Sequence, residues 1–152
     1  MAEPGRAFVC GWPVNHSRSP MIHRYWLAKY GLSGDYVKHP SKPEDFQTFI
    51  RSLDALGFVG GNITVPHKEA AFQLADEPEA EATRMQAANT LWLENGKIRA
   101  TNTDGYGFLA NLDDRSPGWD SQEKRQRGAL VLGAGGAARA IIDALQQRGF
   151  QH

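Results

Sequence analysis

A glycine-rich turn near the carboxyl end of the chain most strongly limits what it can fold into. The turn, Gly133-Ala134-Gly135-Gly136-Ala137-Ala138, follows a short apolar run at 129–132, and apolar residues then recur at helical spacing as far as Leu145. A strand, a G-x-G-x-x-A turn and a helix in that order begin a dinucleotide-binding βαβ unit. The glycines allow a tight turn and a close approach to a pyrophosphate, and the helix N-terminus offers N–H groups to its phosphates.

After the helix stop at Arg148-Gly149, three residues remain. We therefore expect residues 129–152 to hold the first strand, the glycine loop and the first helix of an incomplete Rossmann-type domain. A strand at 129–132 would have no parallel neighbour in its own unit. It would pair with another chain, dock on the preceding domain or be poorly ordered, and a homodimer is thus left open.

Composition excludes several classes of function. The chain has 152 residues, of which 41% are hydrophobic and 22% charged, as in ordinary globular proteins. Lys plus Arg and Asp plus Glu each number 17, so the zero net charge predicts no nucleic-acid partner and no anionic membrane partner. No apolar stretch is long enough for a membrane span, and residues 1–6 lack the apolar region of a signal peptide, so we expect neither.

The single cysteine, Cys10, excludes an internal disulfide and lies in an apolar run, which predicts a buried, inert thiol in a reducing compartment. We therefore expect a cytoplasmic location. The five histidines show no metal-ligand spacing with each other or with Cys10, so we predict no metal site.

Alternating strand and helix patterns predict an α/β domain over residues 1–112, with a three-layer architecture and a mostly parallel mixed sheet. A polar, charged stretch at 113–128 contains Pro117-Gly118 and is the best candidate for a linker. Strands are expected at 7–11, 35–38 and 59–65, and helices at 67–75, 79–86 and 103–112. A hairpin is expected at 90–93 and 97–100, with Asn95-Gly96 as its turn. A further helix is expected to begin near Ser19, which is a plausible N-cap, and to carry Tyr25 and Trp26 on one face.

Several polar groups lie where a plain α/β core would not need them. His16-Ser17-Arg18-Ser19-Pro20 follows the end of the first strand, the edge at which open α/β sheets bind ligands. Two hydroxyls at i and i+2 can both face a carboxylate or a polyhydroxylated ligand. A serine turn followed by a helix cap explains the same residues.

The segment Gly61-Asn62-Ile63-Thr64-Val65-Pro66-His67-Lys68 is more unusual. Asn62 and Thr64 share one face of a strand, and Lys68 opens a helix against its dipole. Such a local conflict is typical of functional sites, although most lysines are simply solvated. Asp104, in Asn102-Thr103-Asp104-Gly105, is a candidate partner that would hold the ammonium for proton transfer. A turn and a helix cap are the alternative explanation of that motif.

Taken together, these motifs resemble those of shikimate dehydrogenases over nearly the whole chain. The resemblance rests on Gly11-x-Pro13-x-x-His16-Ser17-x-Ser19-Pro20-x-x-His23, Gly61-Asn62-x-Thr64-x-Pro66-x-Lys68, Ala88-Asn89-Thr90, Asn102-Thr103-Asp104-Gly105 and Gly133-Ala134-Gly135-Gly136-Ala137-x-Arg139. The family reduces 3-dehydroshikimate to shikimate reversibly with NADPH, in the shikimate pathway to chorismate and aromatic amino acids. The resemblance therefore implies a small-molecule substrate and an oxidoreductase activity.

The resemblance also implies roles for individual residues. Ser17 and Ser19 would bind the shikimate carboxylate, and Lys68 would be the catalytic acid/base at the C3 oxygen with Asp104 as its partner. Ring hydroxyls would be held by Asn62, Thr64, Asn89 and Asp104. The cofactor phosphates would be held by Gly133, Ala134, Gly135, Gly136, Ala137 and Arg139.

The chain covers about half of a typical family member, so we expect a substrate domain, a linker and a first βα unit that is inactive by itself. The residue that reads the ribose, about twenty residues past the glycine loop, would fall beyond His152. NADP is therefore implied by the resemblance alone, and NAD stays open. A quinate/shikimate dehydrogenase and a non-catalytic shikimate-binding module are the alternatives. A generic α/β domain would instead leave Lys68 and Asp104 far apart.

Overall fold

Alternation of side chains along the first strand, β1 (Arg6–Gly11), sets the layers of the domain. In the computed structural model, which describes residues 5–151, Phe8 belongs to the main buried cluster and Val9 to a second cluster. Phe8 contacts Phe49 of helix α2 (Pro43–Arg51) at 4.9 Å between ring centroids. Val9 clusters with Tyr36, which stacks on His23 of helix α1 (Ser19–Lys29). Successive side chains therefore anchor helices on opposite faces of the sheet.

The sheet has six strands in the order β2-β1-β3-β5-β6-β4, and β5 runs antiparallel to both of its neighbours. The other pairs, β1 with β2, β1 with β3 and β4 with β6, are parallel. The remaining strands are β2 (Asp35–Pro40), β3 (Phe58–Ile63), β4 (Glu77–Pro78), β5 (Thr90–Glu94) and β6 (Lys97–Thr101). Two short helices, α3 (Lys68–Leu74) and α4 (Ala80–Met85), flank β4.

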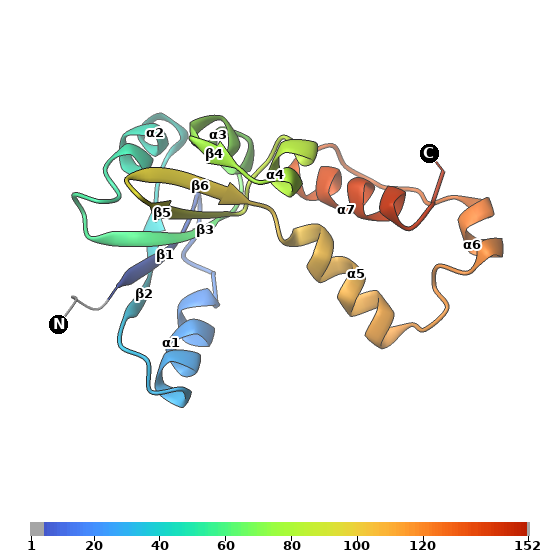
Figure 1. Cartoon of the computed structure of the whole chain (residues 1–152), viewed down its shortest axis with the longest axis horizontal. Helices are drawn as coiled ribbons and strands as arrows, with labels where there is room; N and C mark the ends of the chain where they lie inside the picture. The colour runs from blue at the N-terminus through green and yellow to red at the C-terminus, as the bar shows by residue number, and fades with distance from the viewer. Residues whose placement is uncertain (1–4, 152) are drawn as a thin grey trace.

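Figure 1 shows α1 on one face of this sheet and α2 and α3 on the other, so the expected mixed α/β sheet is confirmed. The hairpin is confirmed as well: Asn95 and Gly96 have φ of 53° and 76°, as a type I′ turn requires. The two-residue strand β4 was not expected, because so short a segment carries no periodicity. The aromatic face of α1 lies in solvent, with Tyr25 61% and Trp26 47% exposed.

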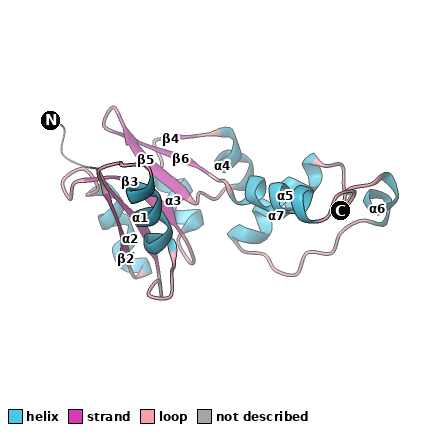
Figure 2. Ribbon diagram, turned by 90° about the horizontal axis from the view of Figure 1, so that it is seen from below, coloured by secondary structure: helices cyan, strands magenta, loops and turns pink. Residues whose placement is uncertain are grey.

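A helical lobe follows the sheet and is clear of it in both Figure 1 and Figure 2. It contains α5 (Asp104–Arg115), α6 (Gln122–Arg127) and α7 (Gly136–Gln147). The predicted linker at 113–128 therefore differs in the structure: it includes the last turn of α5 and all of α6. Arg148 forms ion pairs with Asp113 and Asp120, and Trp119 stacks on Phe150, which holds this segment against the end of α7.

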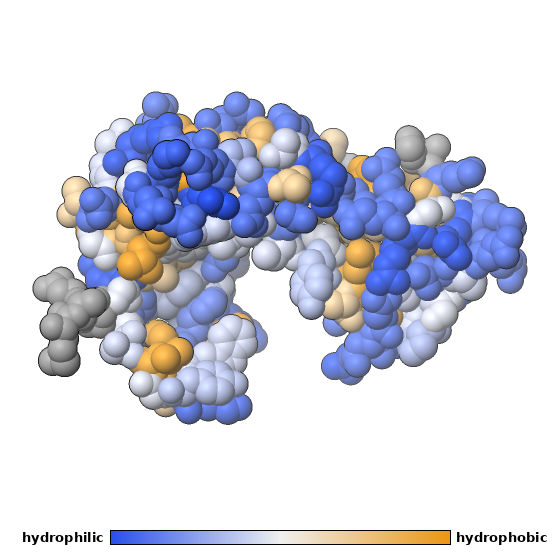
Figure 3. All heavy atoms as spheres, viewed as in Figure 1, coloured by the Kyte–Doolittle hydropathy of each residue, from blue (hydrophilic) through white to orange (hydrophobic). Residues whose placement is uncertain are grey.

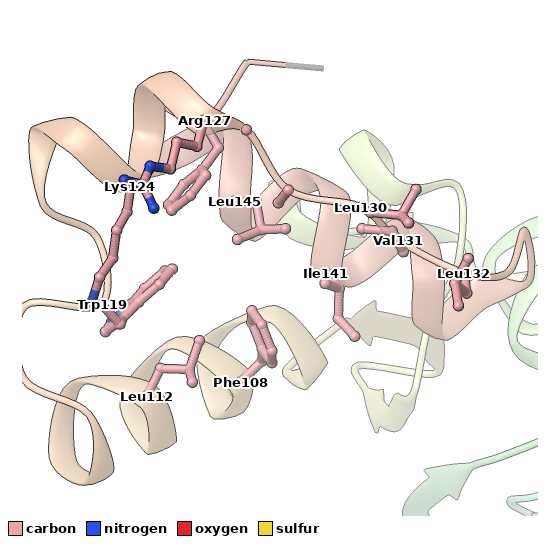
Figure 4. Close-up of a pocket in the computed structure, with 13 residues that line it drawn as sticks. Phe108, Leu112, Trp119, Lys124, Arg127, Leu130, Val131, Leu132, Ile141 and Leu145 are labelled. Carbon is pink, nitrogen blue, oxygen red and sulfur yellow. The ribbon is translucent and has the colours of Figure 1, made fainter.

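The expected strand at 129–132 does not form. The segment is extended but has no ladder partner among residues 5–151, and a strand exists only as part of a ladder. Leu130 and Leu132 are 86% and 88% exposed. Figure 4 shows these side chains beside a groove of about 580 Å³ that is also lined by Phe108 of α5 and by Ile141 and Leu145 of α7. On the face drawn in Figure 3, apolar atoms gather between the helices of this lobe, and the molecule is hollowed between α1 and α5.

Within residues 5–151, none of the helices has the length and apolar character needed to cross a bilayer.

We predict that Gly61→Ala destabilises the fold. A Cβ at this position would lie 2.3 Å from the carbonyl oxygen of Phe8 and 2.6 Å from its ring, so the β1–β3 pair would have to separate. Overpacking of this kind costs about 1–3 kcal/mol of unfolding free energy, measurable by urea denaturation. Gly107→Ala in α5 is the matched control, because nothing lies within 4 Å of the added carbon. The control should gain about 0.5–1 kcal/mol from helix propensity, and equal effects of the two variants would contradict the prediction.

We also predict that stability falls as the pH drops from 7 to 5. Burial lowers the pKa of His23 and of His39 from 6.5, so the unfolded chain binds protons at a higher pH than the folded chain does. The stabilisation is complete above the unfolded pKa and is lost as the pH falls through the folded values. His39 stacks on Phe49 at 3.5 Å, and His39→Phe keeps an aromatic ring there but removes the titration. The variant should show a shallower loss between pH 7 and 5 than the wild type, and identical slopes would contradict this origin.

Candidate active site

The sheet topology brings the polar motifs to one edge. Strands β1, β3 and β6 run in the same direction, so the segments that follow them leave the sheet at the same end, and antiparallel β5 begins there. The N–H of Trp12, just after β1, donates to the carbonyl of Val65, just after β3, at 3.0 Å. Residues from four separate motifs thus meet at the carboxyl edge, where open α/β sheets form ligand sites.

Lys68 and Asp104 form an ion pair at this edge, as the sequence predicted, although they are 36 residues apart. Lys68 is the first residue of α3 and Asp104 the first residue of α5, so their positions follow from where β3 and β6 end. Their side chains are 15% and 30% exposed, respectively. The pair is therefore partly screened from water but still open to a ligand.

Asn89 holds the Asp104 carboxylate from the other side. Its Nδ2 donates to Asp104 Oδ1 at 2.8 Å and to Thr103 Oγ1 at 3.0 Å. Its Oδ1 accepts the backbone N–H of Thr103 at 3.1 Å and the hydroxyl of Thr90 at 2.9 Å. The carboxamide is fully used within the protein, so the orientation of Asp104 is fixed before any ligand arrives.

Asn62 lies next to this group because of strand register. Asn62 on β3 pairs with Thr90 on β5, and its Nδ2 donates to Thr90 Oγ1 at 3.1 Å. Its Oδ1 accepts a hydrogen bond of 2.6 Å from the hydroxyl of Tyr36 on β2. Asn62 pairs with Val9, whose side chain faces α1, so this part of the site lies on the α1 face of the sheet.

The remaining predicted substrate residues lie at the same edge. Ser17 donates its hydroxyl to that of Ser19 at 3.2 Å, and helix α1 begins at Ser19 with Arg18 as its N-cap, so Ser19 is not the cap that its sequence suggested. Thr64 follows β3, and its N–H donates to the carbonyl of Cys10. In the described part of the chain, no hydrogen bond joins these three side chains to Asn62, Asn89 or Lys68. The structure therefore places them at the edge without linking them to the central network.

The glycine loop approaches the lysine directly. A Cβ on Gly136 would lie 3.2 Å from Cβ of Lys68, so only glycine allows this approach without displacement. A cavity of about 250 Å³ is lined by Val65, Pro66, Lys68, Glu69, Gly135, Gly136 and Ala137. Helix α7 begins at Gly136, and its first N–H groups lack partners within the helix. Arg139, predicted to bind the cofactor, forms an ion pair with Glu69 of α3 at 3.2 Å.

Burial shifts three groups near the site. It raises the pKa of the Tyr36 phenol well above its usual range and lowers that of the His23 imidazole. It also raises the pKa of Cys10 to about 12, which agrees with the buried, inert thiol that was expected. Tyr36 and His23 are therefore both neutral at pH 7.

Sequence reasoning missed three supporting residues. Tyr36 and Thr90 carry hydrogen bonds within the site, and Asn102, only 2% exposed, donates to the carbonyl of Ala87 while accepting the N–H of Asp104. Thr90 and Asn102 belong to the motifs Ala88-Asn89-Thr90 and Asn102-Thr103-Asp104-Gly105, but no function was predicted for their side chains. Tyr36 stood in a predicted strand with no signal of its own.

The comparisons with known proteins agree with this geometry. Residues 9–91 match the family model of the shikimate dehydrogenase substrate binding domain. The shikimate dehydrogenase (NADP(+)) of Rhizobium meliloti is 57% identical over 147 residues, which cover 95% of this chain and 50% of that protein. The chain therefore spans about half the length of this relative.

Solved structures show the same fold. The shikimate dehydrogenase of Aquifex aeolicus superposes with a TM-score of 0.87 at 37% identity, covering 98% of this chain and 55% of that one. The Thermus thermophilus enzyme, solved with NADP(H) and shikimate, has a TM-score of 0.81 at 35% identity, covering 96% of this chain and 53% of that one. With its family-model match over residues 9–91 and this shared fold, the chain belongs to the shikimate dehydrogenase family.

Proposed function

We propose that this chain supplies the substrate-binding and proton-transferring part of a shikimate dehydrogenase, which reversibly reduces 3-dehydroshikimate to shikimate with NADPH. The observation that carries the proposal is the Lys68–Asp104 ion pair at the carboxyl edge of the sheet, beside the glycine loop. The relatives are named as NADP(+)-dependent enzymes of this kind. An intact acid/base pair argues against a module that only binds shikimate.

Lys68 is proposed to act as the acid in reduction and as the base in oxidation. Negative charge builds on a ketone oxygen as it receives a hydride, and a positioned ammonium stabilises that charge and supplies the proton. Asp104 keeps the ammonium in place, since its other oxygen is held by Asn89. In the reverse direction, Lys68 takes the proton from the substrate hydroxyl.

The neighbouring polar groups are proposed to hold the rest of the substrate. Ser17 and Ser19, at the start of α1, would bind its carboxylate. Thr64 offers a hydroxyl that has no side-chain hydrogen bond within residues 5–151. Ring hydroxyls would contact Asn62, Thr64 and Asp104, and Asn89 would have to exchange one of its hydrogen bonds within the protein to contact one as well.

Residues 133–137 fit a cofactor phosphate. Gly136 needs to lack a side chain where it passes Lys68, and the N-terminus of α7 faces the same cavity. A bound nicotinamide dinucleotide would supply the hydride, and NADP is proposed over NAD because of the relatives. Arg139 would have to exchange its contact with Glu69 to reach a phosphate.

We propose residues 1–112 as the substrate domain, 113–128 as a connecting segment that carries α6, and 129–152 as the start of a nucleotide-binding domain. The exposed Leu130 and Leu132 support this division, because they mark an extended segment whose apolar side chains are not packed in a sheet. A cytoplasmic location stays a prediction, supported by the single buried cysteine.

We predict that the 152-residue chain binds shikimate and that Lys68→Met and Asp104→Asn weaken this binding at least tenfold. Each variant removes one charge of the pair while keeping a side chain of similar size, and a hydrogen bond to a charged group contributes about 1.5–3 kcal/mol. Isothermal titration calorimetry with shikimate, and with quinate as the comparator, measures the effect. Lys29→Met at the exposed end of α1 is the matched control and should bind like the wild type.

If the folded wild-type chain binds neither compound, the proposed substrate site is wrong. Tighter binding of quinate than of shikimate would favour a quinate/shikimate dehydrogenase. Equal binding by the wild type, Lys68→Met and Asp104→Asn would move the substrate away from this ion pair.

We further predict no turnover of 3-dehydroshikimate with NADPH by this chain alone at the rates usual for enzymes, about 1–10³ s⁻¹. The physical reason is that residues 129–132 do not form a sheet with any part of residues 5–151, so the cofactor site is held by the glycine loop and α7 only. Loss of NADPH absorbance measures the rate. A rate within that range would overturn the prediction and would make the 152 residues sufficient for catalysis.

A further inference from the structure

A continuous line of side-chain hydrogen bonds crosses the sheet from a buried phenol to the carboxylate that holds Lys68. The hydroxyl of Tyr36 donates to Asn62 Oδ1 at 2.6 Å, and Asn62 Nδ2 donates to Thr90 Oγ1 at 3.1 Å. The hydroxyl of Thr90 then donates to Asn89 Oδ1 at 2.9 Å, and Asn89 Nδ2 donates to Asp104 Oδ1 at 2.8 Å. The four bonds join β2, β3, β5 and α5.

The direction of every bond is fixed from the Asp104 end. A carboxylate only accepts, and the backbone N–H of Thr103 only donates, so Asn89 must turn its amino group to Asp104 and its oxygen to Thr103. The oxygen of Asn89 then receives the hydroxyl proton of Thr90, which leaves the Thr90 oxygen to accept from Asn62 Nδ2. The oxygen of Asn62 consequently faces Tyr36, whose hydroxyl must donate.

Tyr36 is held firmly enough to act as the end of this line. Its side chain is buried with Val9 and Val14, and the residue is 4% exposed. His23 of α1 stacks on its ring at 4.0 Å with 5° between the planes. Burial disfavours the phenolate, so the hydroxyl keeps the proton that it donates to Asn62.

We propose that Tyr36 and Thr90 are positioning residues of the substrate site, which hold the carboxamide of Asn62 with its amino group pointing along the line toward Asp104. Tyr36 donates to Asn62, and Thr90 accepts from Asn62 while it donates to Asn89, whose own orientation is set by Asp104 and the N–H of Thr103. The choice of shikimate as ligand rests on the proposed function, whereas the orientation of the amides does not.

The consequence for ligand binding is a fixed pattern of donors and acceptors. An asparagine side chain can flip at little steric cost, and a flip of Asn62 would turn its amino group toward Tyr36 and its oxygen toward Thr90 and the carbonyl of Asn89. A flipped Asn89 would also turn its oxygen toward the carboxylate of Asp104. Thr90 and Tyr36 therefore keep the oxygen of Asn62, which accepts one hydrogen bond from Tyr36 and has a second lone pair, as the group that a ligand hydroxyl can meet.

The test uses Tyr36→Phe and Thr90→Val in the 152-residue chain, with Thr90→Ser as the conservative rescue. Calorimetry measures the dissociation constant for shikimate, and nuclear magnetic resonance measures the ¹⁵N–H signals of the Asn62 and Asn89 amino groups. Both hydroxyl-removing variants should weaken binding about tenfold, which corresponds to a single hydrogen bond of about 1.4 kcal/mol. Both should also shift the amino signals of Asn62, and Thr90→Ser should restore binding and signals.

Matched controls lie outside the site. Tyr30→Phe removes an exposed phenol at the end of α1. Thr83→Val removes a hydroxyl in α4 that donates to the carbonyl of Glu79, the residue before this helix. Neither should change the dissociation constant or the amide signals. Thermal unfolding of each variant shows whether it is folded, and Thr90→Ala replaces Thr90→Val if the valine variant is not.

Unchanged amide signals in folded Tyr36→Phe and Thr90→Val would overturn the positioning role, whatever the ligand. Shifted signals with unchanged shikimate affinity would overturn it as well, because the amides would then not set the affinity. If the wild type binds no shikimate while the signals shift as expected, the proposed function fails and the orientation of the amides by Tyr36 and Thr90 stands.

Discussion

Asn89 satisfies hydrogen-bonding groups from three segments at once, and the position of the Lys68–Asp104 ion pair depends on it. Its backbone N–H donates to Thr101 of β6 and its carbonyl accepts from Ile63 of β3, while its side chain fixes Thr103 and Asp104. Each group left without a partner in such a part-buried site costs about 1–3 kcal/mol. The ends of two strands and the start of α5 are therefore held together by one residue, and Lys68 is then held by Asp104.

Sequence patterns predicted the parts of this structure whose signals are local. Short apolar runs identified the first strands, and Asn95-Gly96 identified the hairpin because few other dipeptides accept positive φ at both positions. The contact between Lys68 and Asp104 is not local, and the sequence offered Asp104 only as a candidate partner of Lys68; the structure shows that the two side chains meet. The strands that precede Lys68 and Asp104 run in the same direction, so the sheet brings their ends to one edge.

The features that sequence did not predict depend on register or on a missing neighbour. Tyr36 reaches Asn62 only because of how β2 and β3 align on either side of β1, and no residue in β2 encodes that alignment. Residues 129–132 have strand-like composition, but composition does not supply the hydrogen-bond partner that a strand needs. The helix α6 within the polar stretch at 113–128 was not expected either, because Arg148, which pairs with Asp113 and Asp120 of this stretch, lies far along the chain.

The contact between the glycine loop and Lys68 is determined by small residues that take no part in chemistry. Helix α7 packs Ala140 against Met85 and Ala87, and a Cβ on Gly105 of α5 would lie 3.1 Å from the carbonyl of Ala140. The ion pair of Arg84 with Asp143 lies at the rim of this contact, where such pairs contribute little to stability. Close packing therefore sets the approach of Gly136 to Lys68. Larger side chains at 105 or 140 would displace α7, and with it the glycine loop, without changing Lys68 or Asp104.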